Sequence, residues 1–173
     1  MENLRGIGLM VASMAGFALA DMFIKGVSGR IPVGEILLVI GIGGSLIFAI
    51  WAISRGEAVI TRDFFSPVIL IKNLGEMIGT FGFVTALALT PISTVSAILQ
   101  ATLLAVTLGA AIFMQEAVGW RRWSAITVGL IGVLIIIRPG LAGFETASLF
   151  AVLAVFGLSI RDLATRAAPK SLS

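Results

Sequence analysis

Lys72, Asn73 and Glu76 stand close together within the apolar stretch PVILIKNLGEMIGTFGFVTALAL, residues 67–89. Residues four apart share one face of a helix, so Lys72 and Glu76 would lie one turn from each other. In one interpretation Lys72 reaches the membrane interface and pairs with Glu76, which neutralises both charges. In the other, Glu76 lines a substrate cavity and offers its charge to a proton or a cationic group, with Lys72 and Asn73 as further contacts.

A second polar group follows in residues 92–114, where Ser93, Ser96, Gln100 and Thr107 have the spacing of one helix face. Hydroxyl groups in a membrane helix can bond their own backbone at little cost, so we expect the serines and the threonine to be structural. The side-chain amide of Gln100 cannot satisfy its hydrogen bonds in this way. It would bond another helix or a bound substrate.

Asp21 and Lys25 lie one turn apart at the outer end of the first apolar stretch. They would form an interfacial ion pair or an outer gate.

Cysteine and histidine are both absent, which excludes disulfides, thiol and imidazole catalysis and the usual zinc sites. An intramembrane aspartyl protease would need two carboxylates that meet, and Asp21 and Asp162 are predicted near opposite membrane faces. The twelve Lys and Arg residues are spread between apolar runs rather than gathered on a nucleic-acid-binding stripe. We therefore expect no enzyme, no metal, no cofactor and no nucleic-acid partner.

The elements that must position these side chains are membrane helices, since 58% of the residues are hydrophobic and only 12% are charged. About 20 helical residues cross a hydrocarbon core, and the first four apolar runs are long enough to do so. The sequence predicts an all-α, polytopic helix bundle with six spans. Their expected ranges are Leu4 to Ile24, Val33 to Ile53, Pro67 to Leu89, Ile92 to Met114, Trp123 to Ile137 and Ala147 to Ile160.

The basic residues predict the orientation, because Lys and Arg in short loops are retained in the cytoplasm. With the N-terminus inside, the cytoplasmic segments hold Arg5, Arg55, Arg62, Arg121, Arg122, Arg161, Arg166 and Lys170. The outer segments then hold only Lys25, Arg30 and Arg138. All three tryptophans would fall at the cytoplasmic interface. A signal peptide cleaved after residue 20 is the alternative, although no exported soluble sequence follows it.

Small residues recur every fourth position in four of the spans, which predicts faces where helix backbones meet. These stripes are Gly8, Ala12, Gly16 and Ala20; Gly41, Ser45 and Ala49; Gly75 and Gly79; and Ala97, Ala101, Ala105 and Gly109. They specify assembly rather than a substrate. A membrane scaffold without transport activity, held together by this packing, is therefore an alternative function.

The stretch from Pro67 to Gly140 resembles the EamA-type transporters of the drug/metabolite transporter superfamily. The resemblance rests on FGFVTALALTPISTVSAILQAT, on AAIFMQEAVGWRRW with its Glu116, and on ITVGLIGVLIIIRPG. Lys72 stands where the family usually has a basic residue. Two positions depart from the family pattern: Leu103 replaces a common proline, which would remove a helix kink, and Gln115 replaces a glycine.

This resemblance implies ten helices in two five-helix repeats of opposite orientation, with a cavity between them that opens alternately to each side. It also implies that the first, third and fourth spans line the cavity. Gly157, Asp162 and Arg166 repeat the spacing of Gly16, Asp21 and Lys25, so the last span echoes the first.

We therefore expect residues 1–140 to form the first repeat and residues 141–173 to open a second, interrupted one. The missing half or a homodimer partner would complete the cavity, although pairing of two copies in opposite orientations conflicts with the charge bias. The function predicted is transport of a small organic solute across the bacterial inner membrane. Glu76 would be the central residue, as a proton or substrate-amine site.

Overall fold

The computed structural model describes residues 2–57, 62–115, 119–137 and 146–169. In these ranges the chain is helical apart from short connections, as predicted. The elements are α1 (Glu2–Val27), α2 (Val33–Ser54), a 3-10 turn η1 (Arg62–Phe65), α3 (Pro67–Leu89), α4 (Ile92–Leu99), α5 (Ala101–Phe113), α6 (Trp120–Ile137) and α7 (Ser148–Ala167). Six segments of this set are long and apolar enough to cross a membrane, with α4 and α5 counted as one. The prediction of six spans is confirmed.

Local signals in the sequence set the ends of α3. The hydroxyl oxygen of Ser66 accepts a hydrogen bond from the backbone amide of Ile69, and Pro67 occupies the first turn, where its missing N–H costs nothing. At the other end, the hydroxyl and the amide of Thr90 both donate to the carbonyl oxygen of Ala86. Pro91 follows as the N-cap residue of α4, which begins at Ile92.

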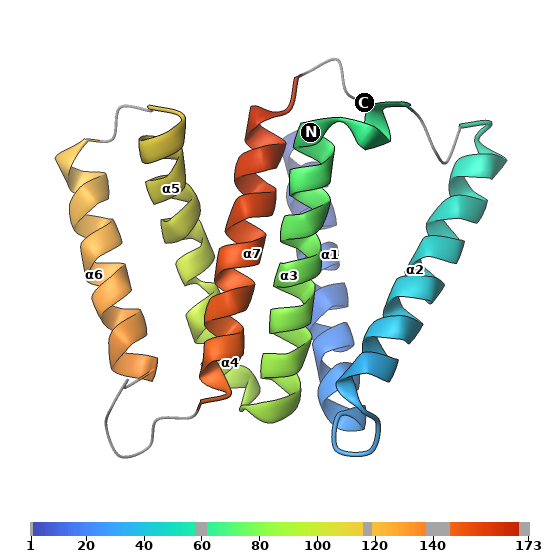
Figure 1. The fold of residues 1–173 in the computed structure, drawn as a ribbon, viewed down its shortest axis with the longest axis horizontal. Helices are drawn as coiled ribbons and strands as arrows, with labels where there is room; N and C mark the ends of the chain where they lie inside the picture. Colours follow the sequence, from blue (N-terminus) through green and yellow to red (C-terminus); the bar gives the residue numbers. More distant parts are fainter. Residues whose placement is uncertain (1, 58–61, 116–118, 138–145, 170–173) are drawn as a thin grey trace.

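α3 and α7 form the centre of the molecule and run antiparallel, side by side (Figure 1). A Cβ atom added to Gly75 would lie 2.7 Å from the amide nitrogen of Arg161, and one added to Gly82 would lie 2.7 Å from that of Ala154. Both distances are shorter than real Cβ contacts. Only glycine therefore lets the two backbones approach this closely, as small residues do at other helix contacts in membranes.

The packing predicted from the small-residue stripes is found for some stripes and not for others. Gly75 and Gly79 of α3 pack against α7, and Gly109 of α5 lies against the side chain of Leu163, so these predicted packing faces are confirmed. The stripes of α1 and α2 are not: the space beside Gly16 and Gly41 is open in the described part of the chain. A stripe of small residues makes a smooth helix face but does not determine which helix, if any, covers it.

Two further boundaries differ from the predictions. α7 continues to Ala167 instead of stopping at Ile160, because Arg161 and Asp162 face the bundle and pair there rather than ending the helix. The fourth span is interrupted at Gln100, although Leu103 stands where a proline would have kinked it. The loss of the proline therefore does not leave this span as one continuous helix.

Replacing Gly157 by alanine should lower the free energy of unfolding by about 1–3 kcal/mol, because the new methyl group would lie 2.7 Å from the Cα atom of Gly79. The apparent melting temperature in detergent would report the loss. Gly132→Ala in α6 is the matched control, since the space beside Gly132 is open and alanine favours a helix by about 1 kcal/mol. Equal melting temperatures for the two variants would contradict the close contact of α3 with α7.

Candidate functional site

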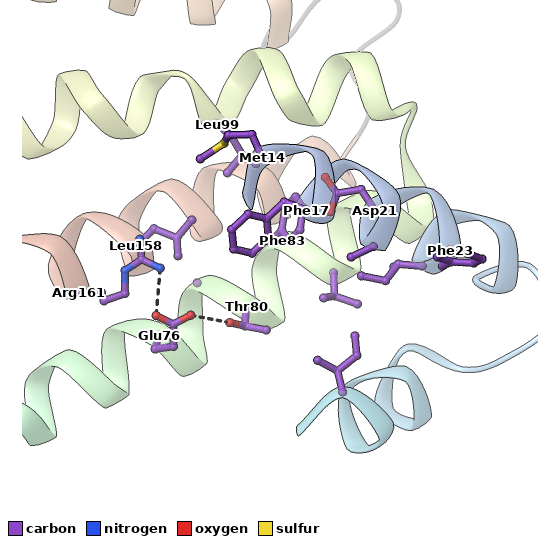
Figure 2. A pocket seen from close by; sticks show the side chains of 15 residues that line it. Met14, Phe17, Asp21, Phe23, Glu76, Thr80, Phe83, Leu99, Leu158 and Arg161 are labelled. Atoms are coloured by element: carbon purple, nitrogen blue, oxygen red, sulfur yellow. Dashed lines mark hydrogen bonds and ion pairs between the residues drawn. The ribbon is translucent and has the colours of Figure 1, made fainter. Parts of the chain in front are cut away.

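A cavity of about 680 Å³ opens between α1, α2, α3, α4 and α7 (Figure 2). Most of its wall is apolar, and the polar exceptions are Asp21, Glu76, Thr80 and Arg161. The apolar part of the lining consists of Met14, Phe17, Ala20, Phe23, Ile24, Ile40, Gly79, Phe83, Val84, Leu99 and Leu158. An apolar cavity with a few convergent polar groups is the usual form of a small-molecule site.

Glu76 lies at one end of the cavity and forms an ion pair with Arg161 of α7. The Nη1 atom of Arg161 is 3.1 Å from the Oε2 atom of Glu76, and the hydroxyl of Thr80 donates to the Oε1 atom over 3.3 Å. The side chain of Glu76 is 49% exposed and that of Arg161 is 32% exposed, so both charges are open to the cavity. A solute or water could reach the pair without unfolding any helix.

Arg161 is held on its other side by Asp162. Its Nε and Nη2 atoms both lie 2.8 Å from the Oδ1 atom of that carboxylate. The guanidinium group therefore shares its charge between two carboxylates, one on its own helix and one on α3. This arrangement fixes the direction in which Arg161 presents its remaining N–H groups.

Sequence reasoning misses Arg161, because hydropathy ends the apolar run at Ile160 and the charge pattern places Arg161 in a cytoplasmic segment. One of the two interpretations paired Glu76 with Lys72, one turn away on the same helix, but no ion pair joins those two described residues. The signal that could have found Arg161 is Gly157, which lies one turn before it. Its partner glycines on α3 stand beside Glu76.

Asp21 and Lys25 have separate environments, so the interfacial ion pair expected between them is wrong. Asp21 lines the cavity from α1 (Figure 2). The Nζ atom of Lys25 instead donates to the carbonyl oxygens of Thr90 and Ala88, at 2.9 and 3.3 Å. These carbonyls lie at the C-terminal end of α3, where the helix dipole favours a positive charge. Lys25 thus ties α1 to the junction of α3 and α4.

The remaining predicted site residues do not line this cavity. Lys72 and Asn73 are half-buried on α3, and Gln100 is exposed at the junction of α4 and α5. Leu99, next to Gln100, does belong to the lining, and through Leu99 the helix α4 contributes to the cavity wall. Thr107 bonds the carbonyl oxygen of Leu103 in its own helix, the structural role expected of it. Glu116, singled out by the family pattern, lies outside the described residues.

The fold and the cavity define a multi-spanning membrane protein in which charged side chains from α1, α3 and α7 converge on an apolar cavity. The sequence pattern of the EamA-like transporter family matches residues 4–138. The chain belongs to this family.

Individual relatives are more distant. The chain is 23% identical over 160 residues to a protein of Rickettsia bellii named as an S-adenosylmethionine uptake transporter, covering 91% of this chain and 54% of that protein. It is 33% identical over 81 residues to a protein of Vibrio cholerae named as a riboflavin transporter, covering 44% of this chain and 27% of that protein. The chain thus spans about half the length of the first of these relatives. No solved structure matches it.

The natural absence of cysteine allows a direct test of whether the cavity holds water. Thr80→Cys on the cavity wall should react with the charged reagent methanethiosulfonate ethyltrimethylammonium at least roughly ten times faster than Thr85→Cys, since only an accessible thiol ionises and reacts readily. Thr85 is the matched control because it lies on the same helix but is only 7% exposed.

Mass spectrometry of the labelled protein in membrane vesicles would give both rates. Equally slow labelling at the two positions would mean that no water reaches the cavity, and would favour the non-transporting scaffold.

Proposed function

We propose that this chain is part of a membrane transporter of small organic solutes and that it works by alternating access. The observation that carries the proposal is the cavity, where the Glu76–Arg161 ion pair faces open space between membrane-length helices. Membership of the EamA-like transporter family supports it. The relatives' names extend the support to solutes such as S-adenosylmethionine and riboflavin.

In this proposal Glu76 is the central site, for a proton or for an amine of the solute. Its pairing with Arg161 supports a role in alternating access, because a proton or a cation that neutralises Glu76 would weaken the contact between α3 and α7 at the cavity. Asn73, Gln100 and Lys72 are proposed as secondary hydrogen-bonding or charge contacts. None of the three lines the described cavity, so each would contact a solute at another point of its path through the protein.

The protein is proposed to lie in a bacterial inner membrane with its N-terminus in the cytoplasm. α1 begins and α7 ends at the same end of the bundle (Figure 1), which is consistent with six crossings. Placing this end in the cytoplasm keeps most of the basic residues inside. It also puts Trp51, Trp120 and Trp123 near one interface.

We further propose that residues 1–140 form one five-helix repeat and that α7 opens a second, inverted one. The echo of Gly16, Asp21 and Lys25 in α7 supports this division. So does the length of the curated relatives, of which this chain spans about half. A second half, or another copy of this chain, would complete the cavity.

Replacing Glu76 by glutamine should reduce solute uptake at least about tenfold, because the loss of a charge-assisted contact typically costs 1.5–3 kcal/mol. Cells that express the complete gene would be assayed with radiolabelled S-adenosylmethionine and riboflavin, with the amount of inserted protein measured by immunoblot. Glu57→Gln, in the connection after α2, is the control that removes an exposed charge away from the cavity. Unchanged uptake by the Glu76 variant would exclude its central role.

The coding sequence after the codon for Ser173 should continue in frame through four further apolar segments of about 20 residues each. DNA sequencing of the native gene would decide this. A stop codon directly after Ser173 would contradict the second repeat, and a partner protein or a second copy would then have to complete the cavity.

A further inference from the structure

We propose that the cavity takes an organic cation with an aromatic or apolar body, and that Asp21, rather than Glu76, is the carboxylate that meets its positive charge. The proposal rests on the transport function proposed above and names the class of its substrate. It depends on how charge is distributed along the cavity wall.

The described cavity wall carries two carboxylates, Asp21 and Glu76, but one guanidinium group, that of Arg161. Arg161 is already engaged by Glu76 at 3.1 Å and by Asp162 at 2.8 Å. Its positive charge is therefore compensated within the protein. The excess charge of the wall is negative, and this excess favours a cationic ligand over an anionic one.

Of the two carboxylates on the described cavity wall, Asp21 is the one without a compensating partner. No hydrogen bond or ion pair among the described residues reaches its side chain. Lys25, the basic residue one turn away, directs its ammonium group to the carbonyl oxygens of Ala88 and Thr90 instead. A carboxylate within a membrane-length helix is costly unless it is paired, and a bound cation would supply the pair.

Aromatic side chains lie between the two charged ends of the cavity. In Figure 2, Phe17 of α1 and Phe83 of α3 stand between Asp21 and the pair of Glu76 with Arg161. Phenyl faces attract cations and also cover apolar rings, so they suit a ligand that combines both. An anion would instead have to displace Glu76 from Arg161 and approach the unpaired Asp21.

A pair of probes that differ in one methyl group and one charge tests this class of ligand. N-methyl-4-phenylpyridinium is a permanent cation, and 4-phenylpyridine is its uncharged counterpart at pH 8. Binding of each radiolabelled probe would be measured by scintillation proximity to the complete protein in lipid nanodiscs. The cation should bind at least about ten times more tightly, the factor expected for one charge-assisted contact.

Variants assign the preference to Asp21. Asp21→Asn should weaken binding of the cation about tenfold and leave the uncharged probe unchanged, which also reports that the cavity is intact. Asp21→Glu should restore part of the preference. Glu35→Gln, at an exposed position in the first turn of α2 and away from the cavity wall, is the control and should have no effect.

Equal binding of the two probes, or a preference for the cation that survives in Asp21→Asn, would overturn the proposal. Transport itself is judged separately, by the dependence of uptake on Glu76. Uptake that requires Glu76 without any preference for cations would refute the substrate class and keep the transport function. Tight, Asp21-dependent cation binding without any uptake would keep the ligand class and refute the transport function.

Discussion

The close approach of α3 and α7 determines the geometry of the cavity. Gly75, Gly79 and Gly157 remove the side chains that would hold the two helices apart, so the backbone of Arg161 lies directly against α3. Because lipid gives helices no hydrophobic reason to associate, such packing of backbone on backbone is a main source of their affinity. The same contact brings the guanidinium group within reach of Glu76, a residue 85 positions away in the sequence.

Three charged residues at or beside the cavity are each compensated within the protein. Glu76 is compensated by Arg161, Arg161 by two carboxylates, and Lys25 by carbonyl oxygens at the end of α3. Each of these interactions joins two helices or stiffens one, so the same contacts both neutralise charge and position the helices. Asp21 is the exception among the described residues of the cavity wall.

Much of the fold could be predicted from the sequence, because apolar length alone identifies membrane helices. The ends of α3 were predicted correctly, since Pro67 and the Thr90–Pro91 step mark them. The end of α7 was not, because Arg161 and Asp162 lower the local hydropathy although their pairing keeps them within the helix. Hydropathy measures the free-energy cost of placing a single residue in the membrane, and it cannot include a partner on another helix.

The candidate site was predictable in part for the same reason. Glu76 was identified as an expensive charge in an apolar stretch, but its partner was sought on the same helix, where Lys72 satisfies the spacing. Sequence spacing predicts contacts within a helix and is silent on contacts between helices. The stripes of α1 and α2 illustrate the same limit, since their small residues have open space beside them in the described chain.

The echo of α1 in α7 is incomplete at one position that matters. When Asp162 is set on Asp21, Arg161 falls on Ala20, and both Ala20 and Arg161 belong to the cavity wall. In the inverted repeat proposed above, the two helices would have started with the same residue there. At this position the α7 wall can form ion pairs and the α1 wall cannot, so in the proposed transporter an elongated solute would be held in one orientation only.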